Sequence, residues 1–141
     1  MSDLELAKAA LIGEATCVLV KDGVQYMSQR SGISPMLGYL AEGAELTGFS
    51  AADRIVGKAA AMLFVKAGVY EVYAQVMSVS GRDYLESHGI AASFGVLTDC
   101  IVNRKNTGMC PMEQCVLNID DCNIGYEALL RRVEELRNSG S

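Results

Sequence analysis

The chain has 141 residues and a formal net charge of −5, and half of its residues are hydrophobic. This length is enough for one domain with a single core, and the acidic balance excludes a general nucleic-acid binder, which needs a basic face. No apolar run reaches the ~18–20 residues of a membrane span, and the acidic start lacks a secretion signal, so we expect a cytoplasmic protein without membrane contact.

The first third of the chain predicts a helix, a hairpin and a second helix. Asp3–Gly13 has the spacing of a short amphipathic helix. Asp22-Gly23 separates two β-rich runs, residues 15–20 and 24–29, and predicts a tight antiparallel hairpin. Ser34-Pro35 then pairs a cap residue with a proline at the first helical position, which predicts a short helix ending at Ala41.

The stretch Phe49–Gly68 is predicted to be one buried helix. Ser50 has the residue type of an N-cap, and Asp53 follows three positions later, where a carboxylate favours a helix start. The stretch is apolar on nearly all sides, which is typical of a buried helix, and Gly68 is suited to end it. Lys58 has two interpretations: a side chain with its ammonium in water, or a cation on the floor of a pocket.

The rest of the chain alternates between strands and helices. Residues 69–79 are rich in β-branched and aromatic types and predict a strand. A helix over Gly81–His88 is expected next, followed by one or two strands within Ala91–Val102, a short helix opening at Cys110-Pro111, and a helix over Gly125–Asn138. This order predicts an α/β protein with a three-layer α/β/α sandwich on a mixed sheet of about five strands, forming one domain over residues 1–141 with a disordered tail from about 138.

Five cysteines in a chain without a secretion signal are predicted to be free thiols. Cys17 and Cys100 lie in apolar runs and are expected in the core. Cys110, Cys115 and Cys122 are separated by four and six residues, which matches no standard zinc pattern. We therefore expect neither a metal nor another cofactor.

Two motifs carry a resemblance that covers about Leu4 to Leu136. GKAAAMLFVKAGV begins at Gly57, and NRKNTGMCPME begins at Asn103. These stretches resemble an uncharacterised family of small bacterial and archaeal proteins, a domain of unknown function with a cytidine-deaminase-like fold. The resemblance implies that fold for this chain, but it implies no reaction, because the family has no settled activity.

The zinc ligands of active deaminases are missing from the corresponding positions. Those enzymes need His-x-Glu at the start of the central helix and Pro-Cys-x-x-Cys at the start of the next. Here the first motif falls on Gly57-Lys58-Ala59-Ala60 and the second on residues 79–83, without a histidine or cysteine in either. Pro111-Met112-Glu113-Gln114-Cys115 resembles the second motif but comes one strand too late, and we treat it as coincidence. Zinc-dependent deamination is therefore not expected.

A ligand site at the strand ends is nevertheless the default for such a fold. The residues expected to line it come from two loops and the central helix: Ser31, Gly32, Lys58, Asn103, Arg104, Thr107, Cys110 and Glu113. The polar loop before Cys110 is suited to a phosphate or carboxylate, but a solvated turn followed by a satisfied helix cap is the favoured interpretation. Cys110 has two interpretations: a nucleophile activated by a helix start, or a structural cysteine.

Two functional hypotheses follow, and the biochemical function stays unknown. The first is a regulatory or ligand-binding protein that does not deaminate and that binds a nucleotide-like or other anionic small molecule. The second is an enzyme of non-zinc chemistry that uses Cys110 or Lys58. A homo-oligomer, formed through an exposed sheet edge or an apolar helix face, is a third option.

Overall fold

The computed structural model describes residues 2–102 and 108–138. Its elements are, in chain order, α1 (Asp3–Ala10), β1 (Cys17–Lys21), β2 (Val24–Ser28), α2 (Ser34–Ala41), β3 (Ser50–Val56), α3 (Lys58–Ala67), β4 (Glu71–Ser78), α4 (Val79–Ser87), β5 (Ala91–Thr98), α5 (Pro111–Val116) and α6 (Cys122–Asn138). The expected α/β class is confirmed.

One mixed sheet holds the strands in the order β2-β1-β3-β4-β5. β1 pairs antiparallel with both β2 and β3, whereas β3, β4 and β5 are parallel. The hairpin predicted at Asp22-Gly23 is present. The two turn residues have φ angles of 48° and 85°, and a tight two-residue turn that matches the right-handed twist of its strands requires such positive values. The helical crossovers α3 and α4 connect the parallel strands.

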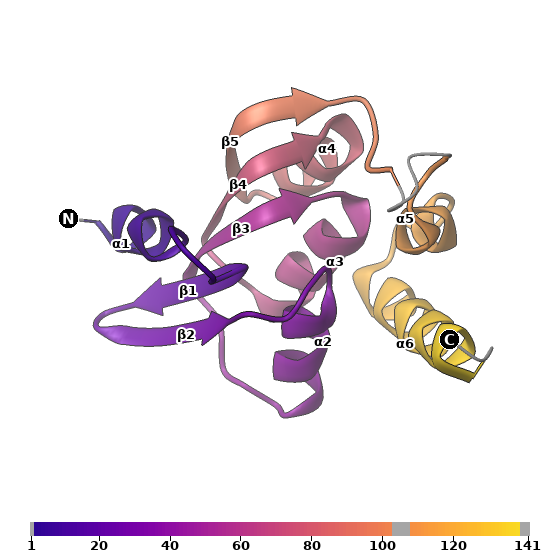
Figure 1. Cartoon of the computed structure of the whole chain (residues 1–141), viewed down its shortest axis with the longest axis horizontal. Helices are drawn as coiled ribbons and strands as arrows, with labels where there is room; N and C mark the ends of the chain where they lie inside the picture. Colours follow the sequence, from indigo (N-terminus) through magenta and orange to yellow (C-terminus); the bar gives the residue numbers. More distant parts are fainter. Residues whose placement is uncertain (1, 103–107, 139–141) are drawn as a thin grey trace.

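The helices form layers on the two faces of the sheet (Figure 1). α1 covers one face at β1 and β3, where Ala7 and Leu11 are buried beside Val18 and Ala52. The opposite face packs against α2, α3 and α4 through the larger core, in which Leu63 and Phe64 of α3 are fully buried. α5 and α6 pack against the outer side of α3, so the three-layer sandwich carries an additional helical pair.

The stretch predicted as one helix contains a strand and a shorter helix. Residues Ser50–Val56 form β3, the middle strand of the sheet, and α3 begins only after Gly57. The prediction was wrong because an alanine-rich strand buried on both faces lacks the alternation that distinguishes strand from helix. Asp53 is therefore a buried strand residue and not a helix cap. Gly68, with φ of 75°, ends α3 as expected.

Two further details differ from the expectations. The apolar run 99–103 adds no strand to the sheet within the described residues; Val102 makes only an isolated bridge with Met109. Cys100 follows the end of β5 and is exposed, so its assignment to the core was wrong, whereas Cys17 is fully buried. α4 is capped by Ser78, two residues before the serine expected to cap it.

Candidate functional site

The carboxyl ends of the three parallel strands meet at one edge of the sheet. β3, β4 and β5 end at Val56, Ser78 and Thr98, and α3 and α4 begin directly after the first two. β2 runs parallel to β3, since both are antiparallel to β1, so the loop after Ser28 lies at the same edge. This edge is where open α/β sheets bind ligands.

The start of α3 is occupied by a carboxylate of the chain itself. Glu113, on α5, accepts hydrogen bonds from the backbone N–H of Lys58 and of Ala59, each 2.8 Å long. Its side chain is only 8% exposed. Burial raises the pKa of Glu113, while the two backbone hydrogen bonds and the Lys58 ammonium oppose that shift. Glu113 thus serves as the helix cap that Gly57 has no side chain to supply.

Gly57 leaves the space in which this carboxylate lies. A Cβ atom at position 57 would come within 2.3 Å of Glu113 Oε1, although the φ of −103° suits any residue. Gly81 permits a second close approach, because a Cβ there would lie 2.9 Å from the Gly57 carbonyl carbon. Two glycines therefore bring the starts of α3 and α4 together with α5.

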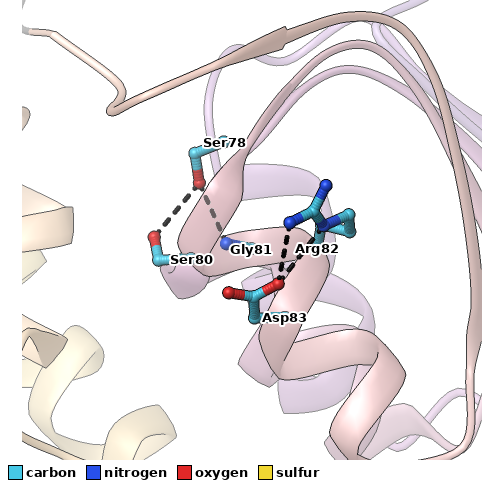
Figure 2. Close-up of polar contacts among 5 residues, drawn as sticks. All are labelled: Ser78, Ser80, Gly81, Arg82 and Asp83. Atoms are coloured by element: carbon cyan, nitrogen blue, oxygen red, sulfur yellow. Dashed lines mark hydrogen bonds and ion pairs between the residues drawn. The ribbon is translucent and has the colours of Figure 1, made fainter.

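The start of α4 has its own polar cluster (Figure 2). Ser78 Oγ accepts a 3.0 Å hydrogen bond from the Gly81 N–H and lies 3.2 Å from Ser80 Oγ. Arg82 forms a salt bridge of 3.2 Å with its neighbour Asp83. The Ser78 hydroxyl thereby satisfies one backbone N–H of the first helical turn, while the other two contacts join side chains.

The predicted site residues are only partly brought together. Lys58 Nζ donates to the carbonyl of Leu117 at the end of α5, 3.2 Å away, which places the ammonium between two helices. Cys110 is the half-buried N-cap residue of α5, and its side chain makes no capping hydrogen bond. Lys58, Cys110 and Glu113 therefore gather where α5 meets α3, and chemistry by Lys58 or Cys110 stays a prediction.

The remaining predicted residues lie elsewhere. Ser31 and Gly32 are exposed in the loop between β2 and α2. Asn103, Arg104 and Thr107 lie outside the described residues.

A polar pocket of about 240 Å³ lies between the end of β2 and α2. Its lining consists of Met27, Ser28, Arg30, Pro35, Gly38, Tyr39 and Glu42. The sequence signal for this pocket was the group Arg30-Ser31-Gly32, which supplies a guanidinium and exposed backbone beside the strand end. Tyr39 packs edge-on against Tyr26, with ring centroids 5.3 Å apart, and this contact holds one wall in place.

A second, apolar groove of about 180 Å³ lies at the carboxyl ends of β3–β5. Ile55 and Val76 form its floor, and Thr98, Cys100, Ile101 and Val102 complete it. Ile55 and Val76 are register partners. The groove contains no charged side chain among its lining residues, so it is suited to apolar contacts.

A buried carboxyl–thiol pair behind the polar pocket was not anticipated. Asp53 on β3 and Cys17 on β1 are register partners and are 6% and 0% exposed. Burial raises the pKa of Asp53 to about 7, against hydrogen bonds from the N–H groups of Arg54 and Ile55, and it raises the pKa of Cys17 further above its usual value. Only the three-dimensional pairing of two strands 36 residues apart reveals the pair.

The residues at the strand ends do not fit a zinc centre of the deaminase type. Gly57–Ala60 stand at the start of α3 and Val79–Asp83 at the start of α4, and neither segment offers an imidazole or a thiol. Within residues 2–102 and 108–138, no group of three or more His, Cys, Asp or Glu side chains is arranged to hold a metal ion.

Comparison with known proteins gives a family and a fold. The family model described as TM1506, a domain of unknown function (DUF1893), matches residues 6–132. The crystal structure of a DUF1893 family protein from Thermotoga maritima superposes with a TM-score of 0.84 at 22% identity, covering 94% of this chain and 91% of that one. No curated protein shows significant sequence similarity to the chain.

Two deaminases align over smaller parts of the chain, each at 17% identity. A diaminohydroxyphosphoribosylaminopyrimidine deaminase/5-amino-6-(5-phosphoribosylamino)uracil reductase from Thermotoga maritima covers 65% of this chain and 34% of its own, with a TM-score of 0.46. The dCMP deaminase of cyanophage S-TIM5 covers 64% and 90%, with a TM-score of 0.44. In the described part of the chain, no helix is long and apolar enough to cross a membrane.

Proposed function

The chain belongs to the DUF1893 family, and we propose that it is a regulatory or ligand-binding protein for a small anionic molecule rather than a zinc-dependent deaminase. The observation that carries this proposal is the polar pocket lined by Arg30 and Tyr39. A guanidinium binds carboxylates and phosphates through paired hydrogen bonds. Both ion pairs found among the described residues involve other arginines, Arg82 and Arg132.

The lining of the pocket constrains the ligand. Ser28 and Tyr39 add hydroxyl groups to the Arg30 guanidinium, so an anion would meet several donors. Glu42 also lines the pocket and disfavours a high negative charge, which favours a ligand that carries a hydrogen-bond donor beside its anionic group. Nucleotide-like molecules have both features.

The size of the pocket is a further constraint. At about 240 Å³ it is smaller than the ~300–1,000 Å³ of typical drug-sized sites. It would therefore enclose a small anion, or the phosphate end of a larger nucleotide whose base lies outside. The start of α3 is a poorer anion site than the polar pocket. The Glu113 carboxylate already accepts its backbone N–H groups and would repel a second anion there.

We propose cytoplasmic action as well. All five cysteines are free thiols in the structure, which suits a reducing compartment.

Isothermal titration calorimetry with inorganic phosphate, ribose 5-phosphate and AMP tests the proposal. We expect at least one of these anions to bind with a dissociation constant below about 1 mM, equivalent to about 4 kcal/mol. Arg30→Ala should weaken that binding at least tenfold. Arg132→Ala is the matched control, because it removes an arginine from an exposed ion pair on α6. Absence of binding by all three anions, or binding unaffected by Arg30→Ala, would contradict the proposal.

A further inference from the structure

We propose that the free edge of β5 is the surface through which two copies of this chain form a twofold dimer, joining their sheets into one of ten strands. β5 is the outermost strand, and no described strand pairs with its outer edge (Figure 1). It has eight residues, whereas the opposite edge strand, β2, has five. Long unprotected edges pair with further strands, and short edge strands resist that pairing.

The β5 edge lacks the charged residues and prolines that usually prevent edge strands from pairing. From Ser87 to Thr98 the sequence contains no Asp, Glu, Lys, Arg or Pro. Phe94 and Val96 are nonetheless 37% and 58% exposed. The apolar surface continues inward, because Val96 pairs with Val76 and Val76 with Ile55, the floor of the apolar groove. Because strand side chains stand perpendicular to the sheet, this apolar patch lies on the sheet face beside the edge. A second sheet joined at the edge would extend the patch across the interface.

Charge favours a second copy as the occupant. Copies with a net charge of −5 repel one another overall, and the repulsion is weakest where the facing strands carry no charge, as on β5. In an antiparallel pair with the twofold axis at Gly95, the nearest strand-end charge, Asp99, lies four residues beyond the axis. The two Asp99 carboxylates are then about 26 Å apart at about 3.3 Å per residue, well beyond the ~8 Å screening length.

The helix beside this edge, α4, carries charges of both signs that would face α4 of the second copy. The Tyr84 hydroxyl donates to the Asp120 carbonyl, 2.6 Å away, so this flank of α4 faces the linker before α6. Arg82 and Glu86 are four residues apart, and the helical period places both on the flank opposite Tyr84. In the proposed dimer this flank faces the second α4, where Glu86 of the other copy would compete with Asp83 of the same helix for the Arg82 guanidinium.

Positions along α4 can also be matched to positions along β5. Ser78, the cap of α4, pairs with Thr98 of β5, and α4 runs back alongside β5 from that point. Gly95 lies about 10 Å back along the strand, which corresponds to about residue 84 or 85 at 1.5 Å per helical residue. The same axis thus passes midway between Arg82 and Glu86 and aligns each Arg82 with Glu86 of the second copy.

The area available is that of a small, weak interface. β5, residues 99–102 and the outer flank of α4 provide about 15 residues per copy, fewer than the ~20–30 of a standard interface. We therefore expect a dissociation constant in the micromolar range.

Sedimentation equilibrium at protein concentrations from about 1 to 100 µM tests the dimer. The wild-type mass should rise from the monomer value of 15.1 kDa toward twice that value. Val96→Lys should remain monomeric throughout the range. Val24→Lys, at a valine of similar exposure (52%) on the β2 edge, is the control and should dimerise as the wild type does. A wild-type chain that is monomeric at 100 µM, or a dimer lost in Val24→Lys and kept in Val96→Lys, overturns the proposal.

A charge exchange provides an independent test that leaves the strand unchanged. Arg82→Glu should weaken the dimer at least fivefold, and adding Glu86→Arg to that variant should restore the affinity. Failure of the second substitution to restore it contradicts the predicted pairing of the helices.

Discussion

The contact between Gly57 and Glu113 provides the sharpest quantitative test of the structure. Gly57→Ala adds a methyl group where the nearest carboxylate oxygen would be only 2.3 Å away, so the Glu113 side chain must leave the start of α3. The backbone at Gly57 is unstrained for alanine, with φ of −103°. The cost therefore comes from the lost carboxylate contact and not from the backbone.

The expected magnitude follows from the groups left unpaired. Glu113→Ala removes the acceptor of two backbone N–H groups, one of them in a buried bond. Hydrogen bonds to charged groups contribute about 1.5–3 kcal/mol each, and part of this is recovered if water reaches the freed N–H groups. We expect Glu113→Ala to lower the free energy of unfolding by about 3 kcal/mol, which lowers Tm by about 10 °C for a chain of this size.

A double-mutant cycle distinguishes this contact from two unrelated losses. Gly57→Ala alone should cost about 2–3 kcal/mol, but less than about 1 kcal/mol in the Glu113→Ala background, where only the preference for glycine over alanine at a cap remains. Urea unfolding followed by circular dichroism measures all four chains. Additive costs within about 0.5 kcal/mol would refute the capping role of Glu113.

Two further predictions concern the buried groups. The folded chain keeps the Asp53 proton up to about pH 7, whereas an ordinary aspartic acid loses it near pH 3.8. Between these pH values folding takes up a proton, so the free energy of unfolding falls as the pH rises. Asp53→Asn should remove this fall, which is up to about 4 kcal/mol. Its urea midpoint should exceed that of the wild type at pH 8 but not at pH 4. Asp99→Asn, at an exposed carboxylate after β5, should leave the urea midpoint unchanged at both pH values. Iodoacetamide at pH 8 should label the exposed Cys100 at once, as measured by peptide mass mapping. Cys17, which is buried and has a raised pKa, should be labelled only under unfolding conditions. Rapid labelling of Cys17 in the native protein would contradict its place between the sheet and the helices.

Local signals in the sequence predicted the elements that depend on local chemistry. Asp22-Gly23 specified the hairpin because both residues tolerate positive φ, and Gly68 specified the end of α3 for the same reason. The β-branched and aromatic residues of β4 and the alternating order of elements were sufficient for the layered α/β architecture. Each of these inferences needed only neighbouring residues.

β3 was missed because its sequence contradicts its position. The segment Ser-Ala-Ala-Asp-Arg-Ile-Val has only two β-branched residues, at Ile55 and Val56, and its alanines favour helix. Burial on both faces of a central strand overrides these preferences, since small side chains suit the close approach of α1 and α3. Gly57, directly after the β-branched pair, was the one signal of a strand that ends before a helix begins.

The candidate site depended on contacts that no local pattern contains. Glu113 was chosen as a ligand-binding residue, but the structure uses it as a cap for a helix that begins 55 residues earlier. The polar pocket combines the end of β2 with α2, and only Ser31 and Gly32 of the predicted residues lie near it in the sequence. Distance along the chain, rather than the choice of residue types, limited the prediction.

The late position of Glu113 has a consequence for how the molecule assembles. During synthesis the sheet can be completed once β5 has emerged, but the amino end of its central crossover helix still lacks an acceptor for two N–H groups until α5 follows. With the sheet formed up to Thr98, α5 at Pro111 is joined to it by a connection of about 12 residues, and closing that connection is a late step with an entropic cost. Nascent chains that stop after β5 would therefore contain a less stable α3. The last third of the polypeptide stabilises the centre of the fold.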